Sequence, residues 1–371
     1  PTVASAGASQ TICASTYTMA GNTPAIGTGS WTVVSGGGTI VTPTLAATTV
    51  TNVGVGNNVF QWTISNGVCP ASTSTMSVFR YDFPTTSVAG PSQSVCATTA
   101  TMAANTPAVG TGSWTLLGGS GTIVTPTSST SQITGLGIGT NSFRWTISNG
   151  VCPPSASTVA IVRYAPPSVA NAGASQTVCA TTATMAANTT TAGSGLWTLV
   201  SGAGTITTPS AANTGITGLG VGNNVFQWTT SNGVCASSSA TTSVYRYDFP
   251  TTSVAGPSQS VCATTATLAG NTPAVGTGSW TLVSGAGTIT SPTSPSSGLT
   301  ALGVGTNVFQ WTISNGTCPA STSTVAIVRY APHSISVAGP SQTVCATTAT
   351  MSANTTTAGS GLWTLLSGAG A

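Results

Sequence analysis

Charged side chains are almost absent from this chain of 371 residues: they make up 2% of it, and lysine and glutamate do not occur at all. General acid–base catalysis depends on a titratable side chain held in a site. The acidic and histidine side chains available for it are Asp82, Asp248 and His333, of which the two aspartates are far apart in the sequence and the histidine lies in a proline-rich segment. We therefore expect that the protein is not an enzyme. A net charge of +3 from scattered arginines also gives no basic patch for binding nucleic acid.

Long apolar runs and metal-binding motifs are missing as well. A membrane-spanning helix needs about 18 or more consecutive apolar residues, whereas the apolar stretches here are short and are interrupted by Thr, Ser and Gly. Metal sites usually draw on closely spaced Cys or His ligands, but no Cys-x-x-Cys pair occurs and there is one His. The sequence thus predicts no membrane span, no bound metal and no cofactor.

A strict tandem repeat organises what is present. The sequence around Ala6 returns at Ala89, Ala172, Ala255 and Ala338, always at the same interval and without insertion or deletion. A fixed period of this kind indicates one structural unit copied in tandem. We expect four complete repeats, residues 1–88, 89–171, 172–254 and 255–337, followed by the first half of a fifth repeat, residues 338–371. Because the last copy lacks its second half, we expect the chain to be a window on a longer protein.

Cysteine follows the same period, in two series that keep a constant spacing within each complete repeat. Periodic cysteines predict a disulfide framework and an oxidising compartment, so we expect an extracellular or cell-surface protein. The disulfide candidates are Cys13, Cys69, Cys96, Cys152, Cys179, Cys235, Cys262, Cys318 and Cys345.

Two pairings of these cysteines remain open. The first joins the two cysteines of one repeat, as in Cys13 with Cys69. The second joins a repeat to the next one, as in Cys13 with Cys152. If successive strands alternate in direction, the first turn and the last hairpin turn lie at opposite ends of one sandwich, whereas a disulfide spans only about 4.4–6.8 Å between Cα atoms. This argument favours the second pairing, but it depends on the number of strands, so the spacing alone does not decide.

The second repeat shows the expected strands most clearly. Short β-branched and aromatic segments alternate with Gly, Pro and Asn turns, and the Asn149-Gly150 pair is a strong hairpin signal. Seven short strands of this kind predict an all-β fold, a tandem array of immunoglobulin-like antiparallel β-sandwich domains. We expect these strands at residues 92–96, 100–104, 113–117, 122–124, 131–134, 141–148 and 157–164.

A tryptophan pair recurs in each complete repeat, on the third and sixth expected strands. A small sandwich needs bulky apolar anchors, which favours a core role over the alternative of an exposed sugar-binding platform. The predicted core tryptophans are Trp31, Trp62, Trp114, Trp145, Trp197, Trp228, Trp280 and Trp311.

An Arg-Tyr pair closes each complete repeat. We interpret it as a junction spacer in which the planar guanidinium stacks on an aromatic ring, and a ligand-binding arginine at each junction is the alternative. The junction sequences alternate with a period of two repeats, which indicates either duplication of a two-repeat block or two kinds of junction. The junction residues are Arg80, Tyr81, Arg163, Tyr164, Arg246, Tyr247, Arg329 and Tyr330.

Four segments of the second repeat carry a resemblance to a known group: residues 89–96 (AGPSQSVC), 112–116 (GSWTL), 135–139 (GLGIG) and 145–152 (WTISNGVC). They resemble the immunoglobulin-like and PKD-like repeats of giant bacterial surface proteins. The resemblance implies a secreted bacterial protein, exported by the type IX route, with adhesin-type relatives.

Strict repetition, periodic cysteines, proline in the junctions and a nearly uncharged surface together favour a structural array that forms an extracellular filament, fibre or cell-surface stalk. Low charge removes the repulsion that keeps copies apart, so we expect self-association with copies of the same chain. The alternative is a multivalent adhesin or glycan-binding array, with surface glycans or other cells as partners. A third interpretation is the accessory region of an enzyme.

Overall fold

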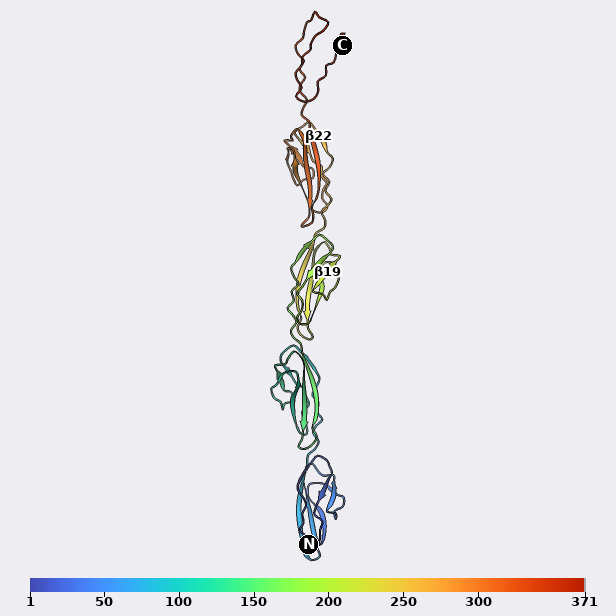
Figure 1. The fold of residues 1–371 in the computed structure, drawn as a ribbon, viewed down its shortest axis with the longest axis vertical. Coiled ribbons are helices and arrows are strands. Elements are labelled where there is room, and N and C mark those ends of the chain that lie inside the picture. Colours follow the sequence, from blue (N-terminus) through green and yellow to red (C-terminus); the bar gives the residue numbers. More distant parts are fainter. Residues whose placement is uncertain (370–371) are drawn as a thin grey trace. The chain divides into compact units, whose positions relative to one another are not determined.

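The computed structural model describes residues 1–369, and over this range the chain consists of strands, turns and loops without a helix (Figure 1). It divides into two compact units. The first comprises Pro1–Val169 with Thr190–Ser194 and Thr230–Ser238, and the second comprises the rest of the described chain. The expected repeat boundaries at residues 88, 171, 254 and 337 stay predictions, although the strands recur with the sequence period.

The first two repeats, both in the first unit, contain seven strands each. In the first repeat they are β1 (Gln10–Ile12), β2 (Tyr17–Ala20), β3 (Thr28–Ser35), β4 (Thr39–Ile40), β5 (Ala47–Thr51), β6 (Gly56–Asn66) and β7 (Cys69–Arg80). In the second repeat they are β8 (Gln93–Val95), β9 (Ala100–Thr101), β10 (Thr111–Gly118), β11 (Thr122–Ile123), β12 (Gln132–Thr134), β13 (Gly139–Ser148) and β14 (Ser155–Arg163). Each of the seven strands predicted in the second repeat is confirmed, with small shifts at the ends.

The third and fourth repeats follow the same order. The third has β15 (Gln176–Val178), β16 (Ala183–Ala186), β17 (Ser194–Ser201), β18 (Thr205–Ile206), β19 (Asn213–Thr217), β20 (Gly222–Ser231) and β21 (Ser238–Arg246). The fourth has β22 (Gln259–Val261), β23 (Ala266–Thr267), β24 (Thr277–Ser284), β25 (Thr288–Ile289), β26 (Gly298–Thr300), β27 (Gly305–Ser314) and β28 (Ser321–Arg329). Residues 338–369 contain a single isolated bridge, between Ala338 and Ala353.

Each complete repeat is a sandwich of a four-stranded and a three-stranded sheet. In the first repeat the sheets have the orders β1-β7-β6-β3 and β2-β5-β4. Pairing is antiparallel except that the first strand runs parallel to the last, with Gln10 opposite Val78. The third, sixth and seventh strands thus share one sheet and the second, fourth and fifth share the other, which is the immunoglobulin arrangement with the first strand on the sheet of the seventh. The predicted fold class is confirmed.

The core of each repeat is built around its tryptophan pair. In the second repeat Trp114 on β10 lies directly opposite Trp145 on β13, and their ring centroids are 5.1 Å apart. A Cβ atom on Gly112, two positions before Trp114, would overlap the Trp145 ring, so only glycine leaves room for that ring against the neighbouring strand of the same sheet. Phe143 and Ile147 point inward on the same face of β13 as Trp145 and are fully buried. Their alternation with half-exposed residues is the period-two pattern of a strand with one buried face.

A buried asparagine at the start of the sixth strand holds two loops together. Asn141 is 1% exposed, and its side-chain amide donates to the carbonyl oxygens of Gly137 and Ile161 at 2.9 and 3.3 Å. Its Oδ1 accepts the backbone N–H of Ser120 at 2.8 Å. These bonds satisfy polar groups that burial would otherwise leave unpaired. Asn58, Asn224 and Asn307 make the equivalent bonds in the other complete repeats.

Candidate functional site

The junctions between successive repeats bring together most of the recurring residues that do not belong to the cores. At the end of the first repeat, Ile12 on β1 pairs with Arg80 on β7, and the backbone N–H of Tyr81 donates to the Ile12 carbonyl at 2.9 Å. Parallel pairing therefore places Cys13 and Tyr81 at the same end of the repeat. Tyr164, Tyr247 and Tyr330 make the same backbone bond at 2.9 Å to Val95, Val178 and Val261.

Three disulfides cross the junctions, each between cysteines 139 residues apart. Cys13 is bonded to Cys152, and their Cα atoms are 5.0 Å apart. The bonds Cys96–Cys235 and Cys179–Cys318 have Cα separations of 5.1 and 5.4 Å. The first two disulfides lie within the first unit and the third within the second. Of the two pairings that the sequence left open, the structure has the one that joins each repeat to the next.

Cys69, Cys262 and Cys345 were disulfide candidates as well, but in the structure they are free and exposed. The bonded pairs have a constant spacing of 139 residues, and a partner at that spacing before Cys69, or after Cys262 or Cys345, would fall outside residues 1–371. Within one repeat the two cysteines lie at opposite ends of the sandwich, because one follows the first strand and the other lies in or beside the turn between the sixth and seventh strands.

The junction tyrosine packs on a glycine of the following repeat. Gly150 has a φ of +54°, and a Cβ atom there would overlap the Tyr81 ring. Tyr164 covers Gly233 and Tyr247 covers Gly316 in the same way. The sequence indicated the Asn-Gly pair only as a hairpin turn. Its glycine serves two needs at once, a left-handed backbone and a flat seat for an aromatic ring.

The asparagine of the same turn bonds to the backbone of the preceding repeat. The Asn149 side-chain amide donates to the carbonyl oxygen of Asp82 at 2.8 Å. Asn232 donates to Ala165 at 2.9 Å and Asn315 donates to Asp248 at 2.8 Å. The hairpin turns of the second, third and fourth repeats thus hold the preceding repeat by a ring contact, an amide hydrogen bond and a disulfide. The recurrence of Asn-Gly at the repeat period was the sequence signal for this contact.

The chain segment that follows the tyrosine is hydrogen-bonded to the next repeat. The Thr85 hydroxyl accepts the backbone N–H of Val109 at 2.9 Å, and the Thr85 N–H donates to the Val109 carbonyl at 3.0 Å. The Ser87 hydroxyl donates to the carbonyl of Trp145 at 2.7 Å. Asn105 accepts from and donates to the backbone on either side of Ser87. Between the first two repeats, few residues are therefore left to act as a hinge.

The junction arginines form their hydrogen bonds within their own repeat. Sequence reasoning placed the guanidinium on an aromatic ring, whereas Arg80 Nη1 donates to the Val53 carbonyl at 2.8 Å, in the loop before the sixth strand. Arg163, Arg246 and Arg329 donate to Leu136, Leu219 and Leu302 at 3.1, 3.2 and 2.9 Å. Arg246 also forms an ion pair with Asp248 at 2.8 Å. The aromatic partner of Tyr81 is Phe79, with ring centroids 4.9 Å apart.

The paired tryptophans of the four complete repeats lie in the cores. All eight are at most 2% exposed, and the centroids within each pair lie 4.9–5.3 Å apart. Buried rings offer no platform to a sugar. Trp363 is the exception at 49% exposed.

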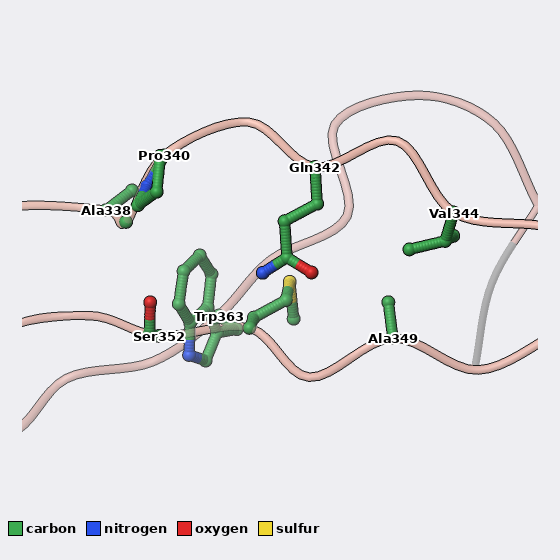
Figure 2. Close-up of a pocket in the computed structure, with 9 residues that line it drawn as sticks. Ala338, Pro340, Gln342, Val344, Ala349, Ser352 and Trp363 are labelled. Carbon is green, nitrogen blue, oxygen red and sulfur yellow. The ribbon is translucent and has the colours of Figure 1, made fainter.

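Trp363 lines a pocket in residues 338–369 (Figure 2). The pocket has a volume of about 290 Å³, and apolar side chains form much of its wall, among them Val344, Ala349 and Met351. Gln342 projects toward the pocket from the opposite segment. In the part of the chain that the structure describes, no group of three or more His, Cys, Asp or Glu side chains could hold a metal ion. No described helix is long and apolar enough to cross a membrane.

Comparison with known proteins gives a likeness in structure alone. No protein family and no curated protein matches the chain. An I-band fragment of titin aligns at 16% identity over 67% of this chain and 99% of the fragment, with a TM-score of 0.43. The N-terminal immunoglobulin domains of Down syndrome cell adhesion molecule align at 10% identity over 88% of this chain and 49% of theirs, with a TM-score of 0.41. The insect immune protein hemolin aligns at 10% identity over 88% of this chain and 99% of its own, with a TM-score of 0.30.

Proposed function

We propose that this chain is a load-bearing tandem array of an extracellular filament or cell-surface stalk, without a catalytic role. The observation that carries the proposal is the pattern of disulfides, since each one joins a repeat to its successor 139 residues further along. A disulfide framework fits an oxidising, extracellular setting. The sequence resemblance to repeats of bacterial surface proteins supports the same setting.

The three disulfide loops overlap along the chain and create a covalent bypass around the folded cores. Tension that enters at residue 1 passes from Cys13 to Cys152, follows the chain to Cys179, and crosses to Cys318. Residues 14–151 and 180–317 lie outside this shortest route. Their strands carry no tension while the bonds are intact, so pulling on the array loads covalent bonds instead of hydrogen bonds.

The contacts around each disulfide oppose bending at the junction. A repeat is tied to the next through the chain itself and through the disulfide, and the tyrosine ring and the asparagine amide fill the space beside them. The following segment is fixed by Thr85 and Ser87. Two covalent connections at one junction restrict bending more than a single linker does. A flexible hinge would need residues without such partners.

An exposed edge strand in each repeat supports self-association. The third strand lies at the edge of the four-stranded sheet in every complete repeat. Just before its last residue this strand has two neighbouring apolar residues that are 40–55% exposed. Edge strands in natural proteins are commonly protected by charge, especially lysine, and this chain has none. The exposed pairs are Val33 and Val34, Leu116 and Leu117, Leu199 and Val200, and Leu282 and Val283.

Assembly of the purified chain tests this function. We expect association at rising concentration by light scattering, and filaments or bundles by electron microscopy. Four substitutions on the edge strands, Val34→Lys, Leu117→Lys, Val200→Lys and Val283→Lys, should abolish association. The matched control places lysine at Val55, Ile138, Val221 and Val304, which are 62–69% exposed in loops. Dispersed, unassociated chains with tight and saturable glycan binding would refute the proposal in favour of an adhesin.

A further inference from the structure

Exposed aromatic side chains occur at alternate junctions between repeats. Among residues 1–329 they lie in two segments, residues 79–83 and 245–249, which we call the two aromatic patches. The junction between them has Val162 and Pro166 at the equivalent positions. The two-repeat period in the junction sequences therefore corresponds to a difference in surface chemistry. The four rings are those of Phe79, Phe83, Tyr245 and Phe249, which are 39%, 57%, 41% and 58% exposed.

Both aspartates of the chain lie in the aromatic patches, each beside an arginine. Asp82 Oδ1 lies 3.8 Å from Arg80 Nη2, and Asp248 Oδ1 lies 2.8 Å from Arg246 Nη2. The two aspartate side chains are 50% and 47% exposed, so both carboxylates remain open to a partner. At the junction between the patches, Ala165 takes the place of the aspartate. Each patch is thus an apolar surface that contains one acidic and one basic group.

The first aromatic patch adjoins the apolar edge of its own repeat. Phe79 on β7 pairs with Asn57 near the start of β6. Ser35, the last residue of β3, pairs with Val59 two positions further along β6. The exposed apolar pair of β3, residues 33–34, therefore lies at the same end of the sheet as Phe79, with only β6 between the two strands. Neighbouring strands are about 4.8 Å apart, so about 10 Å separates β3 from β7.

The exposed area of the rings corresponds to a weak contact that has to be repeated. An aromatic side chain buries about 150–250 Å² in total, so two half-exposed rings offer about 200 Å² in each patch. Two chains that bury both of their patches remove about 800 Å² of ring surface from water, whereas stable protein interfaces begin at about 1,200 Å². The apolar edge pairs beside the patches supply further area. A stable contact between two chains therefore needs both patches together with the edge.

A second copy of this chain fits these surfaces in two respects. It carries two patches with the same spacing along the chain, so the contacts at both patches form together and reinforce each other. Each patch holds both members of an ion pair, so a copy related by a two-fold axis places its aspartate beside the arginine of the first copy, and its arginine beside the aspartate. A partner with charge of one sign would instead bring like charges together at each patch.

We propose that two copies of this chain associate at the aromatic patches, patch on patch, so that their register changes only in steps of two repeats. The contact buries the exposed rings of both copies and continues over the neighbouring edge pairs. The junction that lacks the rings and the aspartate makes no such contact. This inference rests on the self-association in the proposed function, and it adds the surface and the register of that association.

Serine substitutions in the full chain test the patches. Phe83→Ser and Phe249→Ser each remove one exposed ring and leave the edge pairs unchanged. We expect the concentration at half-association, measured by light scattering, to rise about tenfold for either substitution and about 100-fold for both. The matched control is Val41→Ser with Val124→Ser, since these side chains are 60% and 55% exposed and follow edge strands β4 and β11 of the other sheet. The control should leave the concentration unchanged.

Photo-crosslinking locates the contact. A photoreactive benzoylphenylalanine at position 83 should link to residues 79–83 or 245–249 of a second copy, as identified by mass spectrometry. The same group at position 166, the equivalent position of the junction between the patches, should give no link between copies. Links from position 83 to other regions of the second copy, or equal linking from position 166, would contradict the patch-on-patch contact.

The outcomes separate this inference from the proposed self-association. If the serine substitutions leave association unchanged while the lysine substitutions on the edge strands abolish it, the chain self-associates but the aromatic patches are not the contact. A parent chain that stays monomeric at every concentration would overturn both ideas together. Loss of glycan binding in the serine variants, with no change in association, would show that the patches bind sugar and would also overturn the inference.

Discussion

The covalent bypass leads to a prediction about how the chain responds to force. If the two ends are pulled with the disulfides intact, the load follows residues 1–13, 152–179 and 318–371. Each bypassed loop, closed by cysteines 139 residues apart, would span about 480 Å if it were drawn out. We expect no such extension in oxidising buffer. After reduction, each complete repeat should unfold separately and contribute about 280 Å, less its folded length.

Disulfide variants test the route itself. The middle bond, Cys96–Cys235, is not on the shortest route. Its double serine variant should therefore show the same extension as the parent chain, although its stability falls by up to about 5 kcal/mol from loop entropy. Replacing Cys13 and Cys152 instead forces the load through residues 1–96, 179–235 and 318–371, which adds about 380 Å.

Single-molecule force spectroscopy with handles at both ends gives the measurement. Repeat-sized unfolding steps in the oxidised chain would refute the bypass. Equal effects of the middle and outer disulfide variants would also contradict it, since only the outer bonds carry the load. If the disulfides instead lay within single repeats, every repeat would still unfold separately but with a shorter extension, which is a third pattern.

Four further predictions concern the junction, the core and the cysteines. Gly67→Ala should lower the free energy of unfolding by about 1 kcal/mol, because the φ of this residue is +58°. Gly150→Ala should lower it by about 2 kcal/mol more, because the added Cβ would also overlap the tyrosine ring of the preceding repeat. Equal losses for the two variants in urea unfolding would rule out the ring contact. Asn141→Ala should destabilise its repeat by about 3 kcal/mol, because buried backbone groups lose their partners, and a loss below about 1 kcal/mol in the same assay would disprove this role. Non-reducing digestion should recover Cys96 linked to Cys235, and recovery of Cys96 linked to Cys152 would overturn the pairing. Thiol labelling of the intact chain should modify Cys69, Cys262 and Cys345.

Much of the fold could be predicted from residue periodicity. In β13, Phe143, Trp145 and Ile147 alternate with more exposed residues, and this pattern identifies both the strand and its buried face. Asn149-Gly150 marks the turn that follows, because both residues tolerate positive φ. These signals are local, so one sequence suffices to interpret them.

The candidate site was harder to predict, because its residues come from different repeats. Arg80 and Tyr81 are adjacent in sequence and were assigned one role, but their side chains contact different repeats. The guanidinium binds a loop of its own repeat, while the ring packs on Gly150 of the next. Side-chain direction after the last strand depends on packing that the sequence pattern does not contain. The role of Asn149 in bonding to Asp82 was missed for the same reason.

The period, the strand pattern and the tryptophan pairs all follow from the sequence alone. Which cysteines meet depends on the tertiary structure. Cys152 lies 139 residues from Cys13, and Cys69 lies less than half as far away. Loop entropy disfavours the longer closure by less than about 1 kcal/mol, so distance along the chain is a weak constraint. Parallel pairing of β1 with β7 carries Cys13 to the end of its repeat where the next hairpin turn begins, and this placement in space selects the bond.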